Sequence, residues 1–327
     1  MKRIEKIDRQ VTTRLAIVGA GEMGRGIAQK FATEGINVDL VDVNKKTLNN
    51  SIKIIKQNLK ILEEAKYLTK RQSSQVLPRI NLVTKLEDIS DVDFVIESIP
   101  ESIELKRSLF KKLDIICSKH TILSSNSSAI SISKIGEVTN RPDRVIGCHW
   151  VSPPYLIPLV EVIRGQETSD ETLNTCIDLL KKAKVVHAVC QKDIPGFIIN
   201  RMQRVIQNDA LDLVERGIAS LEDVDNIFWL ALGIRFALNG PLKTNDLTVD
   251  KTVSLYGCDF MFKETGDPRF KASPLLREKV RKGELGIKTG RGWYDYGKSS
   301  FADLKMKRDI NLAKLITFMR KEGMLPS

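Results

Sequence analysis

A glycine-rich turn between an apolar strand and a helix constrains this chain more than any other feature of its sequence. The strand is expected at Leu15–Val18 and the helix at Met23–Glu34, where apolar residues recur at helical spacing. The turn reads Gly19-Ala20-Gly21-Glu22-Met23-Gly24. Its first glycine permits a tight turn, the second lets the backbone approach a pyrophosphate, and the third lets helix and strand pack closely. The sequence therefore predicts a dinucleotide site at the helix N-terminus.

An acidic residue follows where the second strand of such a unit ends. Asp42 lies in the run Val38–Val43, about twenty residues after the turn. A carboxylate there accepts hydrogen bonds from the adenosine ribose and repels a 2′-phosphate, so the pattern favours NAD over NADP. The alternatives are an ordinary strand-end acid and a turn with a purely structural role.

The alternation of short apolar runs with helical patterns indicates βαβ units and a parallel sheet. After the first two strands, further strands are expected at Asn81–Thr84, Phe94–Ser98, Thr121–Ser124, Val145–Cys148, Leu159–Ile163 and Val185–Val189. Helices are expected at Glu104–Cys117 and Thr172–Lys184, and Lys45–Leu77 is interpreted as two helices broken near Lys66–Thr69, with Thr69 as an N-cap.

The alternation stops near Lys192-Asp193-Ile194-Pro195-Gly196, where proline and glycine mark a boundary. Beyond it the periodicity is helical, with helices expected at Phe197–Glu215, Leu221–Leu232, after Pro241 and in a tail at Asp303–Lys321. We therefore place the domains at residues 1–193 and 194–327. A chain of 327 residues is long enough for two domains.

Composition excludes several classes of protein. The chain is 42% hydrophobic and 28% charged, as expected of a globular protein, and no apolar run is long enough to span a bilayer. Met1–Arg14 lacks the apolar segment of a signal peptide. Five scattered cysteines without CxxC spacing argue against a disulfide framework and a zinc site, and for a reducing cytoplasm.

The net charge of +11 could indicate an anionic partner. The basic residues are spread along the chain and form no dense block with interleaved aromatics, so we predict neither nucleic-acid nor membrane binding. A nucleotide-bearing substrate would suit the charge equally well.

His149 is the residue best placed to act as a base. The chain has three histidines; His120 lies in a polar turn and His187 inside an apolar strand, whereas His149 follows the strand Val145–Cys148. Strand ends in such sheets face the ligand crevice, and histidine titrates near working pH. Glu161 is an isolated acid in the apolar run Leu159–Ile163, where burial is costly without a partner. We expect it to orient His149; an outward-pointing Glu161 is the alternative.

Several segments together resemble the 3-hydroxyacyl-CoA dehydrogenase family, and the resemblance extends to about Tyr296. They are GAGEMGRGIAQ, VIESIPESIELKRSLF, ILSSNSSAIS, RPDRVIGCHWVSPPYLIPLVEVI, DIPGFIINRM and LGIKTGRGWYDY. The resemblance implies an α/β fold: an N-terminal Rossmann-like parallel sheet with a helical hairpin insertion, followed by an all-α domain that usually dimerises. The tail after Tyr296 has no assigned counterpart and is expected to form an extra helix.

The resemblance also implies residue roles. The family's catalytic His–Glu pair falls on His149 and Glu161, its active-site serine on Ser128 and its asparagine on Asn200. Its cofactor contacts fall on Asp42, Glu101, Lys106, Ser128 and Lys288. Ser152 stands where the family has an asparagine near the nicotinamide.

The implied activity is NAD-dependent oxidation of a short-chain L-3-hydroxyacyl-CoA by a cytoplasmic homodimer. Two alternatives stay open. One is a dehydrogenase of a free hydroxy acid or carnitine, because Arg235-Phe236-Ala237 before Gly240-Pro241 resembles the gulonate and carnitine dehydrogenases, and no CoA-contacting serine and lysine are clearly matched in Asn58–Lys66. The other is a non-catalytic NAD-binding relative.

Overall fold

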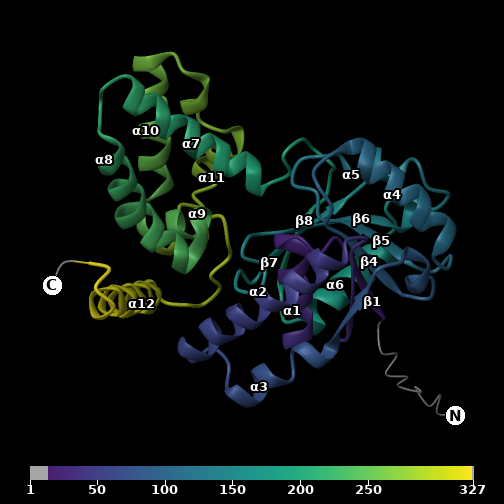
Figure 1. Ribbon diagram of the computed structural model, residues 1–327. Coiled ribbons are helices and arrows are strands. Elements are labelled where there is room, and N and C mark those ends of the chain that lie inside the picture. The colour runs from purple at the N-terminus through teal and green to yellow at the C-terminus, as the bar shows by residue number, and fades with distance from the viewer. Residues whose placement is uncertain (1–13, 326–327) are drawn as a thin grey trace, which may run out of the picture. The chain divides into compact units, whose positions relative to one another are not determined.

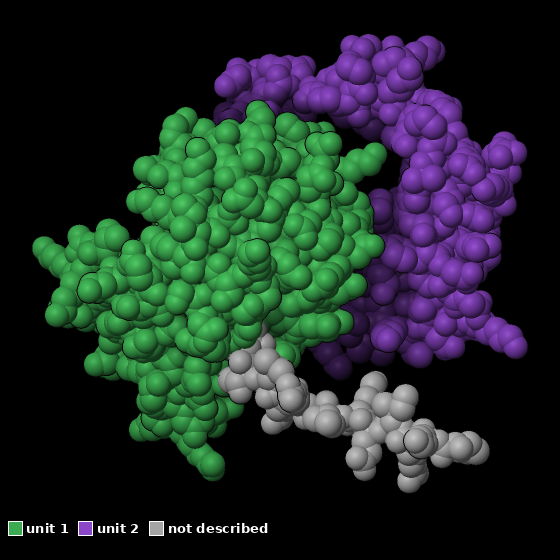
Figure 2. All heavy atoms as spheres, turned by 90° about the vertical axis from the view of Figure 1, so that its right-hand side faces the viewer, with its two compact units in different colours: residues 1–206 green, residues 207–327 purple. Residues whose placement is uncertain are grey.

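The computed structural model describes residues 14–325 (Figure 1). The chain divides into two compact units, residues 1–206 and 207–327 (Figure 2). The division lies inside helix α7 (Ile199–Glu215), so α7 begins in unit 1 and continues into unit 2.

Unit 1 is built on one eight-stranded sheet with the order β3-β2-β1-β4-β5-β6-β7-β8. The strands are β1 (Leu15–Val18), β2 (Val38–Val41), β3 (Ile80–Val83), β4 (Phe94–Glu97), β5 (Ile122–Ser125), β6 (Val145–Trp150), β7 (Leu159–Arg164) and β8 (Val186–Cys190). All eight predicted strands are confirmed, with ends shifted by one or two residues.

The direction of the last strands corrects the expectation of an all-parallel sheet. β1 to β6 are parallel, but β7 pairs with β6 in the antiparallel sense and β8 follows β7 in parallel. The physical reason is the connection, because parallel neighbours need a long crossover and the loop between β6 and β7 contains no helix.

Helices cover both faces of the sheet, so its strands are apolar on both sides. On one face α1 (Glu22–Thr33), α2 (Lys45–Glu64) and α6 (Asp170–Lys182) share an apolar core with Leu15 and Ile17 of β1. On the other face α4 (Ile103–Ile116) and α5 (Ile132–Gly136) share a second core with Ala16 and Val18 of β1 (Figure 1).

The predicted helix pair after β2 forms, with a shorter second member. The helix α3 (Lys70–Ser74) begins at Thr69, which forms a capping box with Gln72. It ends at Ser74, and Leu77–Arg79 form a separate 3-10 turn that contains Pro78, which has no amide hydrogen to donate within a continued helix.

Unit 2 is helical. After α7 it contains α8 (Leu221–Asn226), a π-type segment at Ile227–Gly233, α9 (Ile234–Thr248), α10 (Lys251–Thr265), α11 (Pro274–Arg281) and α12 (Phe301–Lys321). The helix α9 is kinked at Gly240, before Pro241. The tail predicted at Asp303–Lys321 forms α12. Within residues 14–325, no helix has both the length and the apolar character needed to cross a membrane.

A buried ion pair organises the glycine-rich segment of unit 2. Asp246 pairs with Lys251, both side chains fully buried, and its carboxylate also accepts hydrogen bonds from the backbone of Trp293 and Tyr294 and from the hydroxyl of Tyr296. This carboxylate raises the pKa of Tyr296, as does burial. The segment Gly292–Tyr296 is thereby fixed to the end of α9.

Candidate active site

The glycine turn has the geometry that a dinucleotide requires. Gly19 has a φ of +104°, and a Cβ there would lie 2.5 Å from the carbonyl oxygen of Ser98. A Cβ on Gly24 would overlap the carbonyl oxygen of Gly19, so strand and helix meet only without one. Gly21 is different: a Cβ there would meet nothing within 4 Å. The protein leaves this space open, and Gly21 caps α1 without a side-chain hydrogen bond.

The remaining residues of the turn flank this opening. The amide of Ala20 donates to Asp42 Oδ2 at 3.0 Å, and the amide of Asn44 donates to Oδ1 at 2.9 Å. Asp42 therefore joins the glycine turn to the start of α2. Glu22 lies exposed in the first turn of α1, and Met23 packs partly buried against the core. Gly21 and Asp42 together fit a dinucleotide, with phosphates at the helix N-terminus and ribose at the end of β2.

His149 and Glu161 lie directly opposite each other in the antiparallel register of β6 and β7. His149 Nδ1 is 3.0 Å from Glu161 Oε2, and both side chains are buried. β7 is not an edge strand, so the outward-pointing alternative for Glu161 is wrong. A carboxylate on Nδ1 selects the tautomer that carries its proton there, which leaves Nε2 to accept a proton.

The second oxygen of Glu161 fixes the segment that leads into α7. Glu161 Oε1 accepts hydrogen bonds from the amide of Ile198 at 2.5 Å and of Ile199 at 3.2 Å. Phe197, just before them, is fully buried with a φ of +49°, and its ring lies 6.0 Å from that of His149. One carboxylate thus orients the histidine and anchors the start of α7.

Ser128 and Asn200, distant in the sequence, meet at one place. The amide nitrogen of Asn200 donates to the backbone carbonyl of Ser128 at 2.6 Å. Ser128 lies exposed after β5, and Asn200 lies in the first turn of α7, two residues after the amide that Glu161 holds. Two features therefore set where Ser128 and Asn200 meet: the bonds by which Glu161 holds the start of α7, and the loop after β5.

Glu101 and Lys106 belong to one network, in which Lys106 is buried and Glu101 is partly exposed. Lys106 is 1% exposed and its ammonium contacts Glu97 at 2.6 Å and Glu101 at 3.3 Å. Glu101 accepts hydrogen bonds from the hydroxyl of Ser127 and the amides of Ser128 and Ala129. Burial raises the pKa of Glu101, but these bonds and the charge of Lys106 outweigh it and lower the pKa below its ordinary value.

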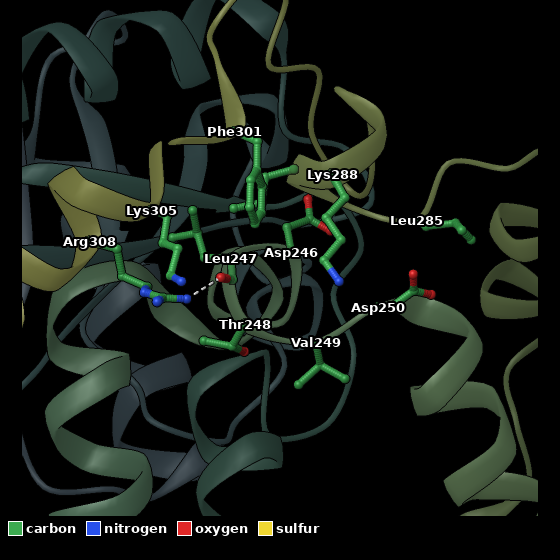
Figure 3. A pocket seen from close by; sticks show the side chains of 11 residues that line it. Asp246, Leu247, Thr248, Val249, Asp250, Leu285, Lys288, Phe301, Lys305 and Arg308 are labelled. Carbon is green, nitrogen blue, oxygen red and sulfur yellow. Dashed lines mark hydrogen bonds between the residues drawn. The ribbon is translucent and has the colours of Figure 1, made fainter. Parts of the chain in front are cut away.

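Ser152 and Lys288 lie on different units. The hydroxyl of Ser152, in the loop after β6, donates to Glu22 Oε1 at 3.0 Å, which ties this loop to α1. Lys288 lines a cavity of about 310 Å³ in unit 2. Figure 3 shows its ammonium directed into this cavity, which Lys305 and Arg308 of α12 also line.

Four residues of the site were missed by sequence reasoning. A Cβ on Gly26 would lie 2.6 Å from Pro154, so only a glycine here leaves room for the loop that follows His149. Asn126 joins three strand ends, accepting from the amide of Trp150 and donating to Ser98. Glu97 and Phe197 are the others. Glu97 gave the one usable signal, an acid in the apolar run Phe94–Ser98. Among the residues that the structure describes, no three His, Cys, Asp or Glu side chains are grouped to hold a metal ion.

Comparisons with known proteins match both halves of the chain. Residues 14–194 match the family model for the 3-hydroxyacyl-CoA dehydrogenase NAD binding domain, and residues 196–296 match the model for its C-terminal domain. A probable 3-hydroxybutyryl-CoA dehydrogenase of Bacillus subtilis is 39% identical over 284 residues, which are 86% of this chain and 97% of that protein. The 5-formyl-3-hydroxy-2-methylpyridine 4-carboxylate 5-dehydrogenase of Mesorhizobium japonicum is 31% identical, covering 90% and 94%.

A solved structure extends the likeness to the tail. The 3-hydroxyacyl-CoA dehydrogenase of Archaeoglobus fulgidus has a TM-score of 0.79 and 30% identity, and the match covers 94% of this chain and 99% of that one. Residues 1–296 alone cannot supply that share, so the match includes part of the tail. With both family models matched along most of its length, the chain belongs to the NAD-dependent 3-hydroxyacyl-CoA dehydrogenase family of oxidoreductases.

Proposed function

We propose that this enzyme oxidises an L-3-hydroxyacyl-CoA with a short acyl chain, such as 3-hydroxybutyryl-CoA, to the 3-ketoacyl-CoA. The observation that carries the proposal is the buried His149–Glu161 pair on the same sheet as the glycine turn. The relatives named 3-hydroxybutyryl-CoA dehydrogenase support the substrate class.

His149 is the base in this proposal. Its Nε2 takes the proton of the 3-hydroxyl group while Glu161, bound at Nδ1, stabilises the imidazolium that forms. The hydroxyl of Ser128 and the amide of Asn200 hold the substrate oxygen as its charge changes. Bound NAD would supply the acceptor for the hydride that leaves the carbon bearing the hydroxyl group, so that this carbon becomes the ketone.

The cofactor contacts are proposed residue by residue. The turn from Gly19 to Gly24 holds the phosphates and Asp42 the adenosine ribose. Glu101, Ser128, Ser152 and Lys288 are the remaining proposed contacts. Lys106, buried against Glu97 and Glu101, is proposed to act through Glu101 rather than to contact the cofactor itself. Each of these residues is replaced in turn, and the affinity for NADH is measured by titration. Replacing a residue that contacts the cofactor should weaken NADH binding.

The activity is tested by mixing the protein with acetoacetyl-CoA and NADH and following the loss of NADH absorbance. We expect turnover with acetoacetyl-CoA, none with free acetoacetate, and a preference for NADH over NADPH. His149→Gln is expected to lower kcat by about 10²–10⁴-fold, the usual contribution of a general base. Turnover that survives His149→Gln would contradict the assignment of the base.

A dehydrogenase of a free hydroxy acid is the second candidate. It is favoured by the Mesorhizobium relative, whose name describes a pyridine carboxylate substrate rather than a CoA thioester. An assay with NAD and gulonate, carnitine or hydroxymethyl pyridine carboxylates, which follows the gain of NADH absorbance, distinguishes the two. Formyl pyridine carboxylates are tested with NADH as well as with NAD. Turnover of one of these, with none on any acyl-CoA, would replace the main proposal.

We also propose that the enzyme is a homodimer formed through unit 2. This unit exposes large apolar side chains on the π-type segment and on α10, among them Ile227, Trp229, Val253, Tyr256 and Phe260. Exposed apolar surface of this extent marks an interface. Light scattering is expected to give twice the chain mass of 36.8 kDa, and Tyr256→Lys is expected to shift it toward one. A monomeric wild-type protein would overturn the proposal.

A further inference from the structure

Another buried acid, outside the residues assigned to the reaction, lies at the end of β4. Glu97 is fully buried, and both its carboxylate oxygens are used. Oε1 accepts from the ammonium of Lys106 at 2.6 Å and the amide of Ile99 at 2.8 Å, and Oε2 accepts from the hydroxyl of Ser125 at 2.6 Å. Glu97 therefore ties together the ends of β4 and β5 and the helix α4.

Lys106 connects Glu97 to Glu101. An ammonium has three N–H donors, and Lys106 has three oxygen partners: Glu97 Oε1, Glu101 Oε2 and the carbonyl of Ile99. At 1% exposure its charge is held between the two carboxylates rather than offered to solvent. In this arrangement Lys106 acts as a bridge between Glu97 and Glu101.

Both carboxylates act on the same short segment, residues 127–129. Glu101 Oε1 accepts from the hydroxyl of Ser127 at 2.6 Å and from the amides of Ser128 and Ala129 at 2.9 and 3.2 Å. From the other side, the hydroxyl of Ser125, which donates to Glu97, accepts from the amide of Ser127 at 3.2 Å. The backbone of Ser128 is thus fixed by a chain of hydrogen bonds that begins at Glu97.

Stability alone does not account for the buried pair of Glu97 and Lys106. Burying two charges is costly, and apolar side chains of similar volume often stabilise a fold equally well. An apolar cluster, however, would not fix the positions of backbone amide groups. Carboxylates fix the positions of the amides that they bind, and the amides fixed here belong to the loop that carries Ser128.

We propose that Glu97 is a positioning residue for the reaction, acting through Lys106, Glu101 and Ser125 to hold the Ser128 loop where the serine meets the amide of Asn200. The inference rests on the proposed function for its kinetic consequences. Its structural consequence is a more mobile Ser128 loop when Glu97 is neutralised. This consequence does not depend on which substrate the enzyme uses.

The first test needs no substrate. Amide hydrogen exchange of residues 127–129 is compared in wild type, Glu97→Gln and the control Asp114→Asn. Asp114 forms a buried ion pair with Arg141 in the same unit, and its hydrogen bonds lie on other residues. We expect exchange in this segment to rise at least tenfold in Glu97→Gln and to stay within twofold of wild type in Asp114→Asn. Unchanged exchange in Glu97→Gln would overturn the proposal.

The second test asks whether Glu97 acts through Ser128. In the wild-type background Glu97→Gln is expected to lower kcat/KM at least tenfold, and in a Ser128→Ala background less than threefold, because the group it positions is already gone. Equal effects in both backgrounds would show a merely structural role and overturn the proposal. Wild-type protein that turns over no acyl-CoA would refute the proposed function while the exchange result still decides this inference.

A milder variant keeps the test decisive if Glu97→Gln does not fold. Ser125→Ala removes one hydrogen bond to Glu97 and one from Ser127 without burying an unpaired charge. It is expected to raise exchange of residues 127–129 and to lower kcat/KM two- to fivefold, again only while Ser128 is present. No change in either measurement would contradict the inference.

Discussion

His149 Nδ1 and Glu161 Oε2 lie 3.0 Å apart across two antiparallel strands, and the other oxygen of Glu161 holds the amides of Ile198 and Ile199. Because β7 runs antiparallel to β6, Glu161 lies directly opposite His149. The carboxylate therefore links the proposed base to the segment that carries Asn200, and a change at Glu161 is expected to affect both.

Glu161→Gln tests this double role. A glutamine has one oxygen and one amide group, so it presents an N–H either to His149 Nδ1 or to the backbone amides. We expect kcat to fall at least about 10²-fold, as for other perturbed general bases, and the Tm to fall as well. Kinetics and thermal unfolding measure the two effects. Glu171→Gln, at an exposed acid paired with Arg144, is the control and should change neither.

Gly21→Ala and Gly24→Ala separate cofactor binding from folding. A Cβ at Gly21 meets no protein atom, so the variant should keep its Tm yet bind NADH at least tenfold more weakly, because the methyl group enters the space left for the pyrophosphate. A Cβ at Gly24 overlaps the carbonyl of Gly19, so that variant should lose stability. Fluorescence titration and thermal unfolding provide the comparison; unaltered NADH affinity in Gly21→Ala would contradict the assignment.

Gly26→Ala tests the contact between the cofactor helix and the loop after His149. The added Cβ would lie 2.6 Å from Pro154, which must move together with the loop that contains Ser152. Overpacking of this kind costs about 1–3 kcal/mol. We expect lower stability and a raised KM for NADH, since the Ser152–Glu22 hydrogen bond belongs to the same contact. The control is Ala28→Gly, on the buried face of the same helix, which should lower the stability without raising the KM for NADH. Gly35→Ala is not used as the control because the positive φ of Gly35 would itself strain an alanine.

Asp114 predicts a pH-dependent part of the stability. Burial raises the pKa of Asp114, but hydrogen bonds from Asn140 and Arg141 outweigh it and lower the pKa. With a lowered pKa in the folded state, the stabilisation is complete above the unfolded value of about 3.9 and disappears as the pH falls through the folded value. Asp114→Asn should therefore lower the free energy of unfolding by about 1–3 kcal/mol at neutral pH and by less in acid. Urea unfolding at several pH values measures this; an equal loss at every pH would contradict it.

The sequence by itself determined the local structure of the cofactor half of the site. The turn from Gly19 to Gly24, the cap at Thr69 and the eight strands depend on residues close together in the chain, so spacing and residue type predicted them. The alternation of short apolar runs with helical patterns also predicted the βαβ units and the parallel strands of the sheet. These features follow from backbone geometry and side-chain period, which need no knowledge of distant partners.

Only the tertiary structure decided which distant groups meet. The sequence predicted that Glu161 orients His149, but the reversal at β7 sets the register that makes this possible. The bonds from the second oxygen of Glu161 to the amides of Ile198 and Ile199 were not predicted. The family resemblance implied that Lys106 contacts the cofactor, whereas the fold buries it against Glu97 and Glu101. Strand direction and the burial of a long side chain depend on contacts between elements far apart in the sequence, and no local pattern records them.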